Sequence, residues 1–384
     1  MQKNLVLLYL LFKSKKLEKN EYIFLVYAAF FVSVVLFCLL INTILLKFST
    51  TLGIRGKEKP LIRWSSISKP ALGGISFYIS FLISTACYGI FFNSQDLFND
   101  GQIIGLIAGV SLAFLMGLAD DAYNTRPWLK FFVQFGCGII LIISSNFTLQ
   151  NETMVIKIFD NQLLNYSLTV IWVVGIMNSI NMLDNMDGIT SITSLFIVLC
   201  ALIFLGIDYS FNHYDFMILL GTIGSLIGFL FYNWHPSKMF MGDSGSQFLG
   251  LLIAAIGIKY FWNLESFDQN EVNIGKQITT VIIVFILPIS DTTAVVINRL
   301  ARKSSPFIGG KDHTTHHLSY LGFTDTQISF IFAGISFISC LIAVTIYRFV
   351  DHWSWINSFL FFLYFFAIFI SLYITTQQHK EQRK

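Results

Sequence analysis

Four short groups of carboxylate, amide, lysine and histidine side chains stand beside glycine or proline in a chain that is otherwise strongly apolar. Carboxylate and amide oxygens are ligands for hard metal ions, and basic side chains bind phosphate. The groups are therefore candidates for metal and phosphate binding. Their sequences are GLADDAYNTRPWLK, NSINMLDNMDGIT, NWHPSKMFMGDSGSQFLG and RLARKSSPFIGGKDHTTHHLSYLG.

In the first group, Asp120 and Asp121 are adjacent. Their side chains point about 100° apart on a helix, so both can face one site only at a frayed helix end. The alternative is a pair that only marks a membrane boundary. Lys130 follows in the same loop and either points toward the same site or extends to the membrane surface.

In the second group, Asn178, Asn181 and Asp184 are spaced by three and share one helix face. Asp187 and Gly188 then end that element. Polar groups on one stripe of an apolar helix need partners or ligands. The alternative to a ligand site is a polar contact between membrane helices.

The third group runs from Asn233 past Pro236, which stops the preceding helix, to Asp243 between two glycines. A glycine-rich turn that opens a helix offers backbone N–H groups to an anion. A carboxylate in this turn would hold Mg²⁺, which prefers oxygen ligands and often bridges to phosphates. An ordinary helix cap is the alternative.

The fourth group is basic and holds His313, His316 and His317. The HExxH pattern of zinc sites is absent and no cysteine is near, so anion binding is favoured over zinc. Asp291 lies three residues after Pro288, inside the preceding apolar segment. That proline is expected to kink the helix.

The elements that position these groups must be membrane helices. The chain of 384 residues is 55% hydrophobic and only 12% charged, whereas soluble domains carry about 25% charged residues. The apolar segments lack the two-residue alternation of barrel strands, so an all-α bundle of about 20-residue spans is expected. We predict one domain that covers residues 1–384 and holds eleven membrane spans, or ten if two short neighbouring segments are misassigned. The predicted spans are 22–46, 72–92, 102–119, 129–145, 167–185, 191–207, 215–232, 246–262, 277–299, 327–348 and 353–375.

The four polar groups are expected on one side of this membrane. Lysine and arginine favour the cytoplasmic side, and they gather in the loops 47–69 and 299–311 and in the tail. Only the basic residues before residue 20 oppose this orientation. The apolar segment 5–12 is too short to span and fits an interfacial helix. Carboxylates for metal, basic groups for phosphate and apolar walls together suit a phosphorylated water-soluble molecule that meets a phosphorylated lipid.

The chain resembles the polyprenyl-phosphate N-acetylhexosamine-1-phosphate transferases, which form glycosyltransferase family 4. The blocks GLADDAYNTRPWLKF, NSINMLDNMDGIT, NWHPSKMFMGDSGS, PISDTTAVVINR and KDHTTHHL occur in the family's order within about residues 70–322. The resemblance implies transfer of a sugar phosphate from a UDP-N-acetylhexosamine to polyprenyl phosphate in the cytoplasmic (inner) membrane, with release of UMP. It implies Mg²⁺, or Mn²⁺ in its place, no nucleic-acid partner, and leaves a homodimer open.

The resemblance also implies roles for individual residues. Asn181 and Asp243 would bind the metal. The implied catalytic residues are Asp120 and Asp121 at the lipid phosphate and His316 and His317 at the diphosphate or sugar. The implied substrate-binding residues are Lys130, Asn178, Asp184, Asp187, Asn233, Asp291 and His313.

Three departures from the family pattern matter, and the third bears on the branch. Asn185 stands where the family more often has glycine, and Thr314 stands where it more often has histidine. The three consecutive histidines typical of the muramoyl-pentapeptide transferases are absent, so the chain looks more like the N-acetylglucosamine-1-phosphate branch that starts surface glycans. The pentapeptide transferase is the main alternative. A transporter is a weaker one, because transporter sites lie near the midplane between repeated halves and no repeat is visible.

Overall fold

The computed structural model describes residues 2–49, 69–92, 100–145, 154–207, 213–264, 273–306 and 309–378. These residues form thirteen α-helices and one short π-helix. Within this part of the chain the extended pairing is a single bridge between Ala71 and Phe240. The helices are α1 (Gln2–Phe48), α2 (Gly73–Phe91), α3 (Gly101–Tyr123), α4 (Pro127–Ser145), α5 (Gln162–Leu183), α6 (Ile189–Ile207), α7 (His213–Asn233), α8 (Gly242–Gly257), η1 (Ile258–Trp262), α9 (Ile274–Val284), α10 (Ile286–Ala301), α11 (Thr314–Tyr320), α12 (Asp325–Phe349) and α13 (Trp355–Gln378).

The predicted all-α membrane fold is confirmed. Ten helices of the described chain are long and apolar enough to cross a membrane, and the pair α9 and α10 raises this number to eleven if it counts as one bent span. Apart from α1, which begins at Gln2 rather than near residue 22, the outer ends of the observed spans lie within a few residues of the predicted ones, because a long apolar segment is what a bilayer requires. The segment 5–12, expected as a separate interfacial helix, is instead part of the continuous helix α1.

The bend between α9 and α10 has a local cause. The two helices meet at 77° around Phe285. Pro288 lies in the first turn of α10, where proline is tolerated, and its ring collides with the carbonyl four residues earlier. That residue is Val284, at which α9 ends. The kink predicted from Pro288 is therefore present, and it divides the span into two helices.

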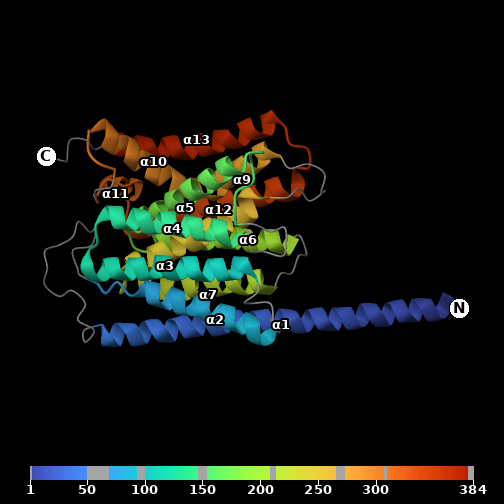
Figure 1. Ribbon diagram of the computed structural model, residues 1–384. Helices are drawn as coiled ribbons and strands as arrows, with labels where there is room; N and C mark the ends of the chain where they lie inside the picture. The colour runs from blue at the N-terminus through green and yellow to red at the C-terminus, as the bar shows by residue number, and fades with distance from the viewer. Residues whose placement is uncertain are drawn as a thin grey trace.

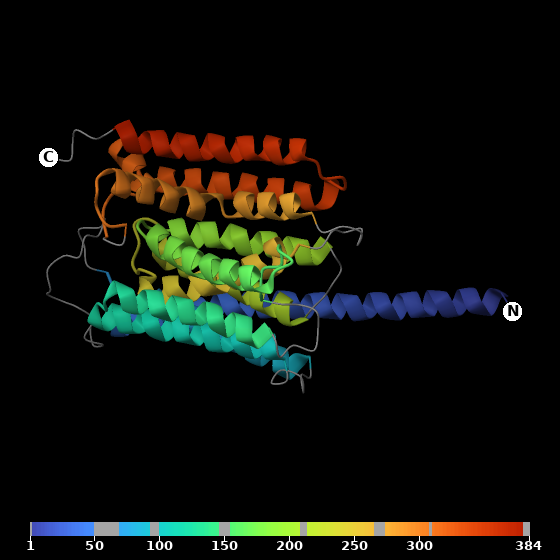
Figure 2. The same ribbon diagram turned by 45° about the horizontal axis from the view of Figure 1, so that its top comes forward.

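The helices run roughly along one common axis (Figures 1 and 2). Helix α1 lies at one edge of the bundle against α2 and α7, and α13 lies at the opposite edge. Helix α8 is central and packs against α2, α3, α5 and α6. Its span is 89% buried, whereas that of α13 is 11% buried. The position of α8 therefore governs what the surrounding helices can bring together.

Helices α2 and α3 approach the first turn of α8 very closely, because glycines lie at the contacts. A Cβ atom on Gly117 would lie 2.2 Å from the carbonyl oxygen of Asp243, and one on Gly74 would lie 2.2 Å from the amide nitrogen of Gly245. Any side chain at either position would push the helices apart. The close approach places the end of α3 directly at the start of α8.

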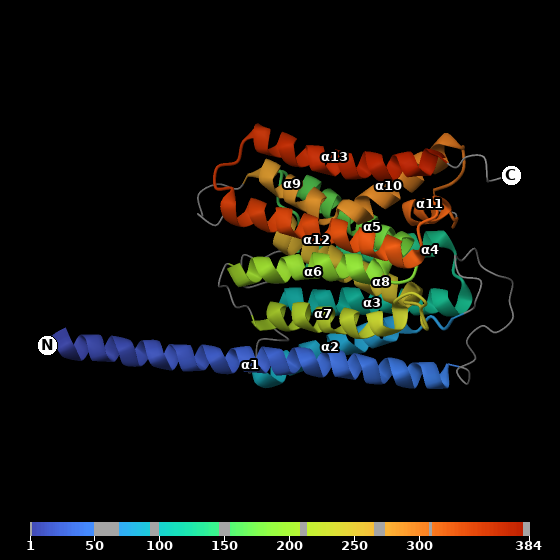
Figure 3. The same ribbon diagram turned by 180° about the vertical axis from the view of Figure 1, so that it is seen from behind.

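The elements that carry the polar groups end or begin on one side of the bundle. The end of α7, the start of α8 and the short helix α11 lie at the same end, as the view from behind shows (Figure 3). Helix α1 begins at the other end (Figure 1). The basic residues Arg299, Arg302 and Lys303 also belong to this end, at the close of α10. Most of the basic loop 47–69 lies outside the described residues.

Candidate functional site

The centre of the site is a group of five side chains from α3, α4, α5 and α8, called here the acidic–lysine cluster. Its cation is Lys130, at the start of α4. The Nζ atom of Lys130 lies 2.5 Å from Oδ2 of Asp120 and 3.4 Å from Oδ2 of Asp243. The other two members are Asp121 and Asn181. Two of the three carboxyl groups, those of Asp120 and Asp243, thus pair with the one ammonium group.

The two adjacent aspartates point to different partners, as their 100° separation requires. Asp121 accepts hydrogen bonds from the backbone N–H groups of Asp243 and Ser244, both at 2.9 Å. It therefore caps the N-terminus of α8, where a negative charge is favourable. Gly242 makes the approach possible, because its φ is +77° and a Cβ atom there would lie 2.8 Å from the Asp121 carboxylate.

Asp120 is buried and turns toward the loop between α3 and α4. It accepts hydrogen bonds from the N–H of Thr125 at 2.7 Å and from its hydroxyl at 2.5 Å, in addition to the contact with Lys130. Asn124 ends α3 in the left-handed conformation, at φ 53°. This turn folds Thr125 back over Asp120, so the carboxylate is fixed from two sides.

The residues spaced by three on α5 lie at different depths. Asn181 reaches the acidic–lysine cluster and donates from Nδ2 to Oδ1 of Asp243 at 2.6 Å and to the Ser246 hydroxyl at 2.7 Å. Asn178 lies one turn deeper and bonds Gln134 on α4 at 2.7 Å. Asp184 is the residue after the last turn of α5. The polar contact between helices, left open as an alternative above, therefore applies to Asn178.

Asp187 holds the connection between α7 and α8. Its carboxylate accepts from the N–H of Ser237 at 3.0 Å and from the hydroxyl of Ser237 at 2.7 Å. His235 Nδ1 lies 3.2 Å and Lys69 Nζ 3.5 Å from the same group. Protein groups therefore already contact both oxygens of a carboxylate that was expected to bind substrate.

Asn233 joins the same two segments. Its Oδ1 accepts from the N–H of Gly188 at 3.0 Å, and its Nδ2 donates to the carbonyl of Met239 at 3.0 Å. Both groups of the amide are thus bonded to backbone. In this structure Asn233 and Asp187 fix the turn that precedes Asp243.

The histidine helix α11 is anchored by Asp291. This buried carboxylate lies 2.8 Å from His313 Nδ1 and accepts from the N–H of Thr314 at 2.8 Å and its hydroxyl at 2.7 Å. Thr314, the departure from the family's histidine pattern, thus binds the carboxylate that fixes the start of the helix.

His316 and His317 are buried on α11. Burial, and then the neighbouring His313, lower the pKa of His316 to about 3. His316 is therefore neutral at pH 7 and can offer hydrogen bonds but no positive charge. The cation beside this helix is Arg299, which binds Asp312 through Nε at 3.1 Å and Nη2 at 2.7 Å.

Helix α5 and the turn after it connect the histidine helix with the acidic–lysine cluster. Thr315 donates to Oδ1 of Asn185 at 2.6 Å, and Ser179, two residues before Asn181, donates to the carbonyl of Pro288 at 2.6 Å. The structure thus brings Asp120, Asp121, Lys130, Asn181 and Asp243 into direct contact and attaches the histidines to the same helix.

Sequence reasoning overlooked two buried glutamines, Gln134 and Gln247, that lie under the cluster. Their spacing could have indicated them, because Gln134 follows Lys130 by four residues and Gln247 follows Asp243 by four, and residues four apart share a helix face.

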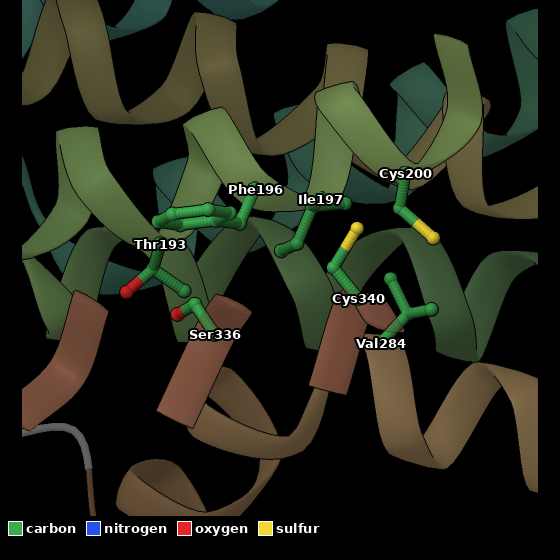
Figure 4. A pocket seen from close by; sticks show the side chains of 7 residues that line it. All are labelled: Thr193, Phe196, Ile197, Cys200, Val284, Ser336 and Cys340. Carbon is green, nitrogen blue, oxygen red and sulfur yellow. The ribbon is translucent and has the colours of Figure 1, made fainter. Parts of the chain in front are cut away.

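The pocket in Figure 4 lies elsewhere, between α6, α9 and α12. Its lining contains no carboxylate, lysine or histidine, so it does not offer the chemistry of the candidate site. The residues that line it are Thr193, Phe196, Ile197, Cys200, Val284, Ser336 and Cys340.

The fold and the cluster define a helical membrane protein with a polar, charged site at one end of the bundle. Residues 103–261 match the model of glycosyl transferase family 4. The match confirms the family resemblance, and it covers every member of the acidic–lysine cluster.

Three relatives show the range of similar proteins. The chain is 26% identical over 279 residues to a protein of Bacillus subtilis (strain 168) named as probable undecaprenyl-phosphate N-acetylglucosaminyl 1-phosphate transferase, covering 72% of this chain and 73% of the relative. It is 27% identical to the phospho-N-acetylmuramoyl-pentapeptide-transferase of Petrotoga mobilis (strain DSM 10674 / SJ95), covering 75% and 87%. It is 29% identical to the protein of the same name from Streptococcus agalactiae serotype III (strain NEM316), covering 49% and 59%.

Proposed function

We propose that this protein transfers an N-acetylhexosamine-1-phosphate, with N-acetylglucosamine as the sugar, from its UDP derivative to polyprenyl phosphate and releases UMP. The observation that carries the proposal is the acidic–lysine cluster at the end of a membrane helix bundle, inside the segment that matches the family. An apolar lipid tail can remain in the bilayer while its phosphate reaches this end. The lipid-linked sugar would then start a surface glycan.

The reaction needs charge neutralisation more than it needs a new nucleophile. A phosphate monoester has its second pKa near 6, so the lipid phosphate is largely a dianion at pH 7 and is already nucleophilic. Its obstacle is repulsion from the negatively charged diphosphate of the donor. Lys130 is the cation of the cluster, and it can neutralise developing charge on the transferred phosphate.

The metal expected from the sequence fits the residues present. The cluster holds three carboxyl groups and one lysine, and the Asp243 side chain is 31% exposed. The side-chain oxygen Oδ1 of Asn181 accepts no hydrogen bond from the described residues and can serve as a metal ligand. Mg²⁺ is often held by one or two carboxylates together with substrate phosphates. Asp243 and Asn181 would hold Mg²⁺, which, once bound, would neutralise phosphate oxygens.

The contacts of the aspartate pair favour direct attack by the lipid phosphate over a covalent enzyme intermediate. Asp121 is occupied by the two backbone N–H groups of α8, and Asp120 by Lys130 and Thr125. Neither carboxylate is free to attack the donor. Asp120 can instead orient Lys130 toward the phosphates.

Direct attack predicts that the enzyme does not exchange labelled UMP into the UDP-sugar when polyprenyl phosphate is rigorously absent. A covalent route would form UMP reversibly without the lipid and would allow exchange. The measurement is the rate of label incorporation by purified protein. Rapid exchange that is lost in Asp121→Asn would contradict direct attack.

The donor assay tests the function itself. Purified protein with polyprenyl phosphate is expected to release UMP from UDP-N-acetylglucosamine, with a kcat/KM at least tenfold above that for UDP-N-acetylmuramoyl-pentapeptide. Inverted membrane vesicles should release UMP from added donor and sealed right-side-out vesicles should not, because the basic end is proposed to face the cytoplasm. Failure to release UMP from either donor would refute the proposal.

The pentapeptide transferase is the second candidate, because several similar proteins carry that name. Against it, the three consecutive histidines typical of that branch are absent, because Thr314 and Thr315 precede His316 and His317. A higher kcat/KM with the pentapeptide donor would establish this second function.

A further inference from the structure

Directly beneath the acidic–lysine cluster lies a second group of polar side chains, called here the amide layer: Gln134, Asn178 and Gln247. Gln134 donates from Nε2 to Oε1 of Gln247 at 3.0 Å, and Asn178 donates from Nδ2 to Oε1 of Gln134 at 2.7 Å. Gln134 and Gln247 are each 1% exposed. Three helices, α4, α5 and α8, are thus joined by side-chain amides inside the membrane part of the bundle.

Two members of the amide layer lie one turn below a member of the cluster on the same helix. Gln134 follows Lys130 by four residues on α4, and Gln247 follows Asp243 by four on α8. Residues four apart share a helix face and lie about 6 Å apart along the axis. The two layers are therefore stacked, with the amides below and the charges above.

The amide layer supplies a link that apolar packing does not. Helix α4 packs mainly on α3 and α5, and next to Lys130 its side chains Trp128, Phe131 and Phe132 are exposed. A helix with one face in lipid can rotate or slide at low cost. The bond from Gln134 to Gln247 ties α4 to α8 itself, and so fixes Lys130 relative to Asp243.

We propose that Gln134 and Gln247 are positioning residues for the transfer reaction. They touch no substrate. They set the rotation and depth of α4 against α8, so that Lys130 lies between Asp120 and Asp243. The inference rests on the proposed function for its kinetic effect, whereas the geometry of Lys130 can be followed without any substrate.

The decisive variant replaces both amides by methionine, which has a similar shape and no hydrogen bond. Removing both partners of a buried hydrogen bond can be nearly neutral for stability. Gln134→Met/Gln247→Met should therefore keep its Tm within a few degrees of the wild type. Because a displacement of about 1 Å can cost 10²-fold in rate, kcat should fall about 100-fold while KM for both substrates stays within about twofold.

A control separates positioning from general packing. Asn42 on α1 is also a fully buried amide, and it bonds Cys38 on a helix that packs against α2 and α7 and supplies no member of the cluster. Asn42→Leu should change kcat by less than about threefold, whatever its effect on the Tm. A second readout is the rate at which an amine-reactive ester modifies Lys130, measured by mass spectrometry. It should rise several-fold in the methionine variants and remain unchanged in Asn42→Leu.

The possible outcomes decide the inference. A kcat above half the wild-type value in the double variant overturns it, and so does an equally large loss of kcat in Asn42→Leu. If the double variant does not fold, Gln134→Met alone is judged by the same criteria. If the wild type releases no UMP, the proposed function fails, and the labelling rate of Lys130 alone decides whether the amide layer positions the lysine.

Discussion

Replacement of Asp243 by asparagine is expected to lower kcat by about 10³-fold while the protein remains folded. The change removes the negative charge that faces Lys130 and Asn181. The fold should survive, because Asp121 caps α8 through the backbone N–H groups of Asp243 and Ser244 and needs no side chain at residue 243. Activity and stability are thus separable at this position.

UMP release and thermal unfolding measure the two quantities for Asp243→Asn. The matched control is Asp215→Asn, because Asp215 also pairs with a lysine, Lys259, at 2.7 Å, but it begins α7 at the opposite end of the bundle. The control should retain most of the turnover. Wild-type kcat and unchanged Mg²⁺ dependence in Asp243→Asn would show that this carboxylate has no part in the reaction.

Replacement of Lys130 by glutamine is expected to lower both turnover and stability. The loss of the only cation in the cluster should reduce kcat by about 10³-fold. It also leaves Asp120, which is 5% exposed, with Thr125 as its remaining donor. Removing one partner of a buried charge pair is strongly destabilising, so the Tm should fall by about 5 °C or more.

The comparison between the two variants is informative. Asp243→Asn should lose activity at nearly constant Tm, whereas Lys130→Gln should lose both. Lys259→Gln, at the other end of the bundle, is the control for loss of a lysine that pairs with an aspartate. Should Lys130→Gln unfold at the wild-type temperature, the ion pair with Asp120 does not hold the end of α3 in place.

The sequence predicted the helices well because the bilayer imposes one simple requirement, a long apolar segment with internally bonded backbone. It predicted the polar groups at one end for the same reason, since charges collect where helices leave the membrane. It predicted the kink at Pro288 but not its size, because the 77° angle between α9 and α10 also depends on how the two helices pack on their neighbours.

Depth along a helix was the main feature that periodicity could not resolve. Asn178, Asn181 and Asp184 share a face, but each step of three residues rises about 4.5 Å. Only Asn181 is therefore level with Asp243, whereas Asn178 joins the amide layer.

The different roles of Asp120 and Asp121 were likewise hidden. Which of two adjacent carboxylates caps α8 depends on how α3 docks on it at Gly117.

The cap from Asp121 to the start of α8 also bears on how the chain is made. The two bonded residues are separated by 122 positions, and the spanning helices α4, α5, α6 and α7 lie between them. Asp120 finds its partners Thr125 and Lys130 as soon as α4 begins. Until α8 has been synthesised, however, α3 enters the membrane with the Asp121 carboxylate lacking the N–H groups that it later caps, at a cost of up to about 3 kcal/mol.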